Sequence, residues 1–432
     1  MPHADSHKHV ADLAAFVVAS PSSYHAAAEV ARVLSEAGFT EQVESEEWDA
    51  SPGGHYLVRD GAVVAWRVPQ GGGVRSGFRI VGTHTDSPTF KLKPDPTYGA
   101  AGWQQVGVEV YGSPLIASWT DRELGIAGRV VTRRGEQVLA RTDAVMRIPQ
   151  LAIHLNRSVN DEGLRLDKQV HTQPIFSVRR PDLQVLDLVT DFVEDGRFPD
   201  GLTGDQVAGH DLVAFDTAKP KLFGADDSFL ACGRLDNLSS VHASMIALLN
   251  TDDSADDIAV LAAFDHEEVG SGTRSGACGP LLEDVLLRTA TALGAGPEEY
   301  RQMLQRSSCI SADAGHAVHP NYVGHHDPVH RPLLNEGPLL KINANQRYAS
   351  DAVGEMLWRR ACAVAGVPLQ QFVSNNQLPC GSTIGPLTAT RLGITTVDVG
   401  IPLLSMHSIR EMAGVDDLYF LTRALQAFWA GA

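Results

Sequence analysis

A short and wholly apolar run, AVLAAF at residues 259–264, is followed at once by the polar tetrad DHEE at residues 265–268. An apolar run of this length, bounded by polar residues, is typical of a buried strand. Further strand-like runs occur at residues 78–82, 309–312, 339–342 and 394–399, and amphipathic helical patterns lie between the later ones. This alternation of strands and helices predicts an α/β fold.

The length of 432 residues favours either two domains or one large domain that carries an insertion. Between residues 91 and 223 the sequence pattern changes to short strand-like segments, such as residues 106–111 and 128–132, which are separated by turn-forming residues. We therefore expect residues 1–90 and 224–432 to form the two parts of a main α/β domain. Residues 91–223 are expected to form an inserted β-rich domain.

The N-terminal region is expected to begin with two capped helices. Ser6 precedes an apolar helical pattern, which we interpret as a capped helix and not as an export signal, because Asp12 interrupts the apolar run. Ser22 and Ser23 are candidate caps of a second helix, and Gly38 stands where that helix should end. No run approaches the roughly 20 apolar residues that a membrane span requires.

Charge and cysteine usage narrow the possible partners and compartment. The formal charge is −17, and the acidic residues are scattered, which argues against nucleic acid as a partner. The five cysteines are odd in number, widely spaced and never arranged as C-x-x-C, so a reducing compartment fits best. We expect a cytoplasmic protein without a membrane partner.

Five candidate metal ligands stand at the ends of predicted strands or in the adjoining loops: His84, Asp236, Glu268, Asp313 and His407. In open α/β sheets, ligands bind at the carboxyl edge of the strands. Two imidazoles and three carboxylates form a nitrogen and oxygen set that suits zinc, cobalt or manganese, and no cysteine is needed.

Two of these motifs include a further acidic residue. Asp86 follows His84 by two residues and can orient its ring, although an H-x-D motif alone is more often a hydrogen-bonded surface histidine. Glu267 and Glu268 are adjacent at a strand end, so one can bind metal while the other serves as general base. The alternative is an acidic loop that caps the next segment.

The remaining ligands also have structural alternatives. Asp236 precedes an apolar helical run, where an N-cap competes with a carboxylate that bridges two metals. Asp313 has the same ambiguity. His407 lies in a loop before an expected helix that contains Arg410 and Glu411, and alone it is equally consistent with a core histidine.

Taken together, the motifs closely resemble the aspartyl aminopeptidase family of dinuclear zinc exopeptidases over nearly the whole chain. The matching motifs are HTDSP (84–88), IPQLAIHLNR (148–157), GRLDNL (233–238), HEEVGS (266–271), DAGHAVHPNY (313–322) and MHSIRE (406–411). The resemblance implies a mixed central sheet flanked by helices, of the zinc-exopeptidase type, with the insertion serving as a dimerisation domain.

The resemblance also implies roles for the candidate ligands. Asp236 would bridge two Zn²⁺ per subunit, with Co²⁺ or Mn²⁺ as possible substitutes. His84 and Asp313 would complete one site, and Glu268 and His407 the other. A water molecule between the two ions would attack the scissile carbonyl, with Glu267 as its general base.

Four further residues are assigned by family pattern alone. His154 would reach the active site of a neighbouring subunit, although the sequence itself favours a surface histidine. Lys341 would pair with an acidic substrate side chain and so favour N-terminal Asp or Glu, against the alternative of a solvent-facing lysine on an edge strand. His316 and Tyr348 would line the same pocket. The partners implied are short peptides with a free N-terminus and other copies of the chain, in a dodecamer built from dimers.

Two other functions use the same residues. A dinuclear-metal deacylase or carboxypeptidase of small amides needs a related set of ligands. Lys341, His154 and the whole-length family match together argue against it. A non-catalytic oligomeric binding particle has no use for Glu267 beside a ligand, so the presence of that carboxylate favours an enzyme.

Overall fold

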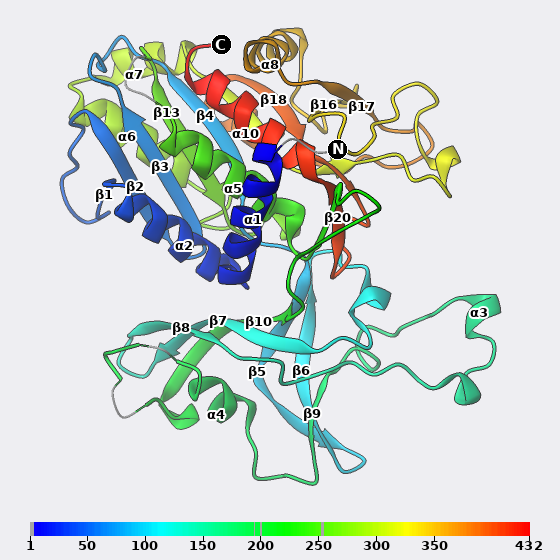
Figure 1. The fold of residues 1–432 in the computed structure, drawn as a ribbon. Helices are drawn as coiled ribbons and strands as arrows, with labels where there is room; N and C mark the ends of the chain where they lie inside the picture. Colours follow the sequence, from blue (N-terminus) through cyan, green and yellow to red (C-terminus); the bar gives the residue numbers. More distant parts are fainter. Residues whose placement is uncertain (1–3, 194, 199–200, 252–254) are drawn as a thin grey trace.

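The computed structural model describes residues 4–193, 195–198, 201–251 and 255–432, and the strands of this part of the chain form three sheets (Figure 1). The largest sheet has nine strands. In spatial order they are β1 (Thr40–Glu41), β2 (Gly53–Arg59), β3 (Ala62–Val68), β13 (Ile258–Phe264), β4 (Phe78–His84), β14 (Ser308–Ala312), β18 (Thr395–Gly400), β16 (Leu339–Ile342) and β17 (Gln370–Val373).

This sheet is mixed, as expected. Its centre, β13-β4-β14-β18, is parallel throughout, whereas β3 and β16 pair antiparallel with its two flanks. Because the four central strands run in one direction, their carboxyl ends meet at one edge. His84 ends β4, Asp265 follows β13 and Asp313 follows β14, so this edge gathers the polar residues of three motifs.

Helices cover both faces of the nine-stranded sheet. One face packs on α1 (Ala4–Ala19), α2 (Ser23–Glu36), α5 (Leu235–Leu249), α8 (Ala352–Ala365) and α10 (Val415–Trp429), and the other on α6 (Leu281–Ala292), α7 (Pro297–Gln305) and α9 (Ile384–Leu392). Along β13, Leu261 and Ala263 join the first core, whereas Val260 and Ala262 join the second. Side chains alternate between the two faces of a strand, so a strand covered on both faces must be apolar throughout.

The local signals at the N-terminus are partly confirmed. The hydroxyl of Ser22 caps α2 by accepting the N–H of His25 at 3.4 Å, and Gly38 follows that helix with a φ of 86°. The cap assigned to Ser6 is wrong, because α1 already includes Ala4 and Ser6 donates to Asp416 of α10 at 2.6 Å. Within the described ranges, no helix combines the length and apolarity that crossing a membrane requires.

The second sheet is antiparallel and has its own core, built around residues such as Phe90, Trp119 and Leu212. Its order is β8 (Gln137–Arg141), β7 (Leu124–Thr132), β10 (Val207–Asp216), β5 (Thr89–Ala100), β6 (Trp103–Tyr111) and β9 (Ile175–Val178). Besides η1 (Ile116–Trp119), η3 (Gly204–Gln206) and α4 (Val185–Thr190), this region carries an arm with η2 (Ile153–Leu155) and α3 (Val159–Glu162). The arm projects away from the sheet (Figure 1).

The third sheet has five short strands: β11 (Lys221–Phe223), β12 (Phe229–Cys232), β20 (Glu411–Gly414), β19 (Pro402–Leu404) and β15 (Gly315–His316). The helix expected around Arg410 and Glu411 is therefore wrong. Glu411 begins β20, where it pairs with Cys232 of β12, and the helix that follows starts only at Val415. A partner strand distant in sequence decided the conformation of this segment.

Candidate metal centre

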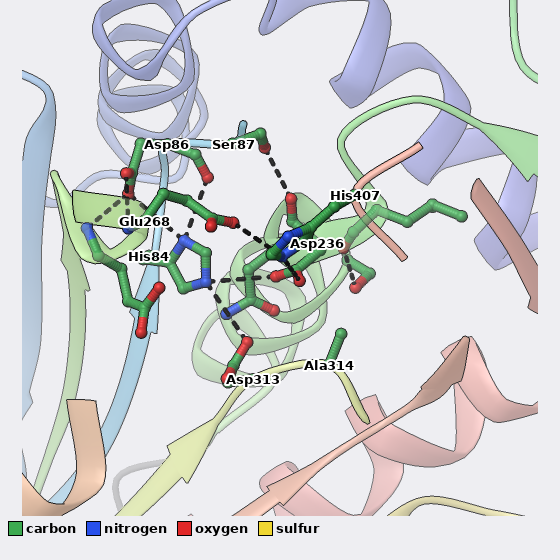
Figure 2. A network of polar contacts seen from close by, with 12 residues as sticks. His84, Asp86, Ser87, Asp236, Glu268, Asp313, Ala314 and His407 are labelled. Carbon is green, nitrogen blue, oxygen red and sulfur yellow. Dashed lines mark hydrogen bonds and ion pairs between the residues drawn. The ribbon is translucent and has the colours of Figure 1, made fainter. Parts of the chain in front are cut away.

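The structure brings all five candidate ligands together at the carboxyl edge of the central strands (Figure 2). His84 ends β4, Glu268 lies in η4 (Glu267–Val269) after β13, and Asp313 follows β14. Asp236 follows β12, and His407 lies in the loop between β19 and β20. The nine-stranded sheet thus supplies three of the side chains, and the five-stranded sheet positions the other two.

The carboxylate of Asp236 lies at the centre, with one oxygen toward each half of the cluster. Its Oδ1 lies 3.3 Å from Nε2 of His84, which is itself 3.4 Å from Oδ1 of Asp313. Its Oδ2 lies 3.3 Å from Nε2 of His407, which is 3.5 Å from Oε1 of Glu268. Two sets of one imidazole and one carboxylate therefore share a single central carboxylate.

The chemistry of these atoms fits divalent metal ions. Oδ1 of Asp236 and Oε1 of Glu268 are buried and have no hydrogen-bond donor among the described residues, although a buried carboxylate oxygen normally has one. One ligand atom from each of His84, Asp236 and Glu268 lies within 4.8 Å of the others. Nitrogen and carboxylate oxygen in such a cluster suit zinc.

Both histidines are oriented by a backbone carbonyl. Nδ1 of His84 donates to the carbonyl oxygen of Asp86 at 3.1 Å, and Nδ1 of His407 donates to that of Ser113 at 3.1 Å. A neutral imidazole that donates through Nδ1 has its lone pair on Nε2, the nitrogen that faces the central carboxylate in both residues. Each ring is therefore held in the tautomer that binds a metal through Nε2.

Proton affinities in the cluster reflect the crowding of carboxylates. Burial lowers the pKa of His84, but the close carboxylates of Asp236, Asp313 and Asp86 outweigh burial and raise the pKa well above 6.5. Burial likewise opposes the shift at His407, where the hydrogen bond to Asp236 raises the pKa to about 9. Burial and the charge of Asp236 raise the pKa of Glu268 well above its usual range. Metal binding must displace these protons, so it competes with acid.

The carboxylate of Asp86 contacts the turn that carries Glu267 and Glu268 as well as the ring of His84. Its Oδ1 lies 3.4 Å from Nδ1 of His84, but it also accepts the backbone N–H of Glu267 at 3.0 Å. Its Oδ2 accepts the N–H of Glu268 at 3.1 Å and the hydroxyl of Tyr111 at 2.8 Å. One side chain thus fixes the turn that carries both glutamates relative to β4.

Glu267 is the adjacent carboxylate that makes no hydrogen bond or ion pair within the described part of the chain. Its side chain is only half-buried, and burial raises its pKa to about 7. A carboxyl group with a pKa near neutrality can both accept and donate a proton. Its environment therefore differs from that of the neighbouring ligand candidate Glu268.

Several residues beside the ligands have left-handed backbone conformations. Arg234, His266, Ser405 and His407 have φ between 56° and 66°, which is uncommon for residues other than glycine and persists only where the surroundings impose it. The backbone of Asp236 is non-helical, with φ of −82° and ψ of 101°, but the N-cap alternative does not hold, because its carboxylate oxygens face His84 and His407 and not the backbone N–H groups of α5.

Sequence reasoning missed Glu411. This buried side chain accepts the backbone N–H of Asp236 through Oε2 at 3.0 Å and that of His407 through Oε1 at 2.8 Å. Burial and the charge of Asp236 raise its pKa to about 8. Its position four residues after His407 could have indicated that it contacts this ligand, but we expected this segment to be helical.

Lys341 is not a solvent-facing lysine on an edge strand. It is 1% exposed, and its strand β16 pairs on both sides, with β17 and β18. Its Nζ donates to Oδ2 of Asp313 at 3.2 Å and to the carbonyl oxygen of Ala314 at 2.9 Å, and lies 5.2 Å from the ring centroid of Tyr348. The lysine is thus buried beside a candidate ligand.

The other predicted pocket residues lie at two different places. The ring of Phe372 lies between Tyr348 and His316, with centroid distances of 6.3 and 5.9 Å, so these side chains form one wall beside Lys341. His154 instead stands exposed on η2 of the arm and contacts none of the candidate ligands of its own chain. Within one chain, it does not belong to the cluster.

Known proteins resemble this chain over nearly its whole length. The family model described as Aminopeptidase I zinc metalloprotease (M18) matches residues 16–429. A probable M18 family aminopeptidase 2 from Streptomyces coelicolor is 49% identical over 428 residues, which cover 97% of each chain. A chain in the cryo-EM structure of the Ape4 and Nbr1 complex is 33% identical with a TM-score of 0.94, covering 99% of this chain and 87% of that one. The mApe1 dodecamer of S. cerevisiae is 27% identical with a TM-score of 0.85, over 99% and 98% of the two chains.

Proposed function

Because this chain belongs to the aminopeptidase I (M18) family of zinc metalloproteases, we propose that it removes N-terminal residues, preferably Asp or Glu, from short peptides with two zinc ions per subunit. Family membership makes the protein a zinc-dependent aminopeptidase. The observation that carries the proposal of two ions is the position of Asp236, whose two oxygens face two separate sets of one histidine and one carboxylate.

In this proposal, His84 and Asp313 would hold one ion, Glu268 and His407 would hold the other, and Asp236 would serve both. Co²⁺ or Mn²⁺ would suit the same donor set. When bound, the two ions lower the pKa of a water molecule and polarise the scissile carbonyl group. The chain itself supplies the orientation of both imidazoles and the placement of Glu267.

Glu267 is the proposed general base. Its carboxylate has no competing partner within the described residues, and Asp86 holds its backbone N–H. Glu267 would accept the proton of the attacking water and then deliver that proton to the leaving amine. In the metal-free protein burial raises the pKa of Glu267 to about 7, and burial of this kind makes the carboxylate a stronger proton acceptor than a surface carboxylate.

The preference for acidic residues rests on Lys341. An ammonium group has three N–H donors, and the hydrogen bonds to Asp313 and Ala314 use two of them. The third donor would bind the side-chain carboxylate of a substrate's N-terminal Asp or Glu, with Tyr348 and His316 as neighbours. The burial of Lys341 would strengthen such a pair, because opposite charges attract more strongly where water is excluded.

We also propose that the region of residues 91–223 is a dimerisation domain and that the subunits assemble as a dodecamer built from dimers. The arm exposes Leu151 by 61% and Leu155 by 74%, on either side of His154. Exposed apolar side chains grouped in this way are typical of an interface. A second copy that covers these leucines would bring its active site close to His154 of the first copy.

A cytoplasmic location stays a prediction, in agreement with five free thiols.

The test is an assay of protein stripped of metal and then reloaded with zinc, cobalt or manganese. The substrates are peptides with N-terminal Asp, Glu, Leu or Lys and one with acetyl-Asp. We expect metal-dependent release of Asp or Glu and none from the acetylated peptide. Cleavage of acetyl-Asp would favour the deacylase, and preference for Leu or Lys would remove the role of Lys341.

A further inference from the structure

We infer that Glu411 is a positioning residue, which holds two segments far apart in the sequence at the separation that the two-metal site requires. Its carboxylate accepts the N–H of Asp236 through one oxygen and the N–H of His407 through the other, at 3.0 and 2.8 Å. The inference rests on the proposed function, because it concerns the two ligands assigned to a shared metal site.

The contacts of Glu411 lie on the backbones of the ligands and not on their side chains. Its two hydrogen bonds leave both oxygens of Asp236 and Nε2 of His407 turned toward the cluster. Glu411 itself is 1% exposed and starts β20, which pairs with β12 immediately before the segment that leads to Asp236. One rigid strand thus carries the group that joins both ligand segments.

Other contacts hold the next peptide unit, between Asp236 and Asn237. The carbonyl oxygen of Asp236 accepts the hydroxyl of Ser87 at 2.7 Å, and the side chain of Asn237 donates to the carbonyl oxygen of Ala312 at 2.9 Å (Figure 2 includes Ser87). These bonds link Asp236 to the strand ends that carry His84 and Asp313. Glu411 provides the remaining link, to His407.

His407 needs such a link more than the other ligands. It lies in a loop with left-handed backbone at Ser405 and at His407 itself, with φ of 56° and 63°. Residues other than glycine adopt this conformation only when their surroundings over-determine it. The hydrogen bond from the N–H of His407 to Glu411 is a contact that does so.

The structure offers a matched control for this kind of contact. Asp417 of α10 is also a fully buried carboxylate that accepts two backbone N–H groups, those of Asn335 at 2.6 Å and Gly337 at 2.8 Å. It contacts none of the candidate ligands within the described residues. Asp417→Asn therefore removes one acceptor from an equivalent pair of hydrogen bonds, as Glu411→Gln does, without touching the cluster.

The experiment compares the wild type with Glu411→Gln, Glu411→Asp and Asp417→Asn. Each metal-stripped protein is titrated with zinc by calorimetry, and its thermal unfolding, kcat and KM are measured. A glutamine has one carbonyl oxygen for two N–H donors, so we expect zinc affinity and kcat to fall by roughly 10- to 100-fold with little change in KM. Glu411→Asp keeps the charge but shortens the reach, and a positioning role predicts a loss there too.

The outcomes separate the inference from its premise. If the wild type binds no zinc, the proposed function fails. If the wild type binds two ions and Glu411→Gln binds them equally well, only the role of Glu411 is overturned. It is also overturned if Glu411→Asp keeps full affinity, or if Asp417→Asn loses as much affinity as Glu411→Gln. Should Glu411→Gln not fold, Glu411→Asp decides by the same criteria.

Discussion

Nζ of Lys341 lies 3.2 Å from Oδ2 of Asp313, so the residue proposed to select the substrate is also paired with a proposed metal ligand. This pair predicts two effects of Lys341→Met. With metal in excess, kcat/KM for a peptide with N-terminal Asp should fall by roughly 10- to 100-fold, the value of one charge-assisted hydrogen bond. A Leu peptide should change by much less. Equal losses for both peptides would mean that Lys341 only orients Asp313 and does not bind the substrate side chain.

Glu267→Gln should lower kcat by about 10²- to 10⁴-fold, the usual contribution of a general base, and should change KM little. The amide keeps the size of the side chain, and Glu267 is not one of the proposed ligands. Metal content, measured by mass spectrometry of the purified protein, should equal that of the wild type. A variant that loses metal together with activity would place Glu267 among the ligands instead.

Asp86→Asn should reduce kcat/KM by roughly 10- to 100-fold, because an amide offers one acceptor oxygen where the carboxylate now accepts three donors. Tyr111→Phe is the graded control. It removes a single donor and leaves both backbone hydrogen bonds of Asp86 in place, so its effect should stay below about tenfold. If both variants lose activity equally, the tyrosine hydroxyl has a role that its contact with Asp86 does not explain.

The metal-free protein should lose stability as the pH rises from about 6.5 to 9. Burial lowers the pKa of His407, but the hydrogen bond to Asp236 outweighs it and raises the pKa from 6.5 to about 9. The contribution of protonated His407 to the free energy of unfolding is therefore complete below pH 6.5 and is lost as the pH rises through 9. Burial raises the pKa of Glu411 from 4.5 to about 8, and this loss has the same sign. Zinc binds better as the ligands lose protons.

The difference in Tm between zinc-loaded and metal-free protein should therefore widen across this pH range. Differential scanning fluorimetry at fixed free zinc measures it directly. In His407→Gln the widening should be smaller, because one of the two titrating groups is missing. A difference that narrows toward pH 9 would contradict the assignment of these groups to the metal site.

Mixing two inactive variants tests whether His154 acts in a neighbouring subunit. Glu267→Gln and His154→Ala should each be nearly inactive alone. If His154 acts in the partner's site, an active site needs Glu267 from one subunit and His154 from the other. In randomly mixed dimers, about a quarter of the sites have both residues intact. Activity that does not rise after unfolding and refolding the mixture together would restrict His154 to its own chain.

Much of the fold follows from local patterns. The apolar run at residues 259–264 became β13, covered on both faces, and Ser22 and Gly38 mark the two ends of α2 as expected. The gathering of His84, Glu268 and Asp313 was also predictable, because polar residues at the carboxyl ends of neighbouring parallel strands meet at one edge. The sequence thus determined the α/β class and the members of the cluster, though not their roles.

Other features depended on contacts between distant segments. The segment at Glu411 became a strand because β12 pairs with it, and Lys341 became buried because β16 has neighbours on both sides. Ser6 lies within α1 and donates to Asp416, more than 400 residues away. Local propensities differ by fractions of a kcal/mol per residue, whereas strand pairing and burial involve larger free energies. Where the two conflict, the tertiary structure decides, and here it alone decided that the buried carboxylate of Glu411 holds the backbones of Asp236 and His407.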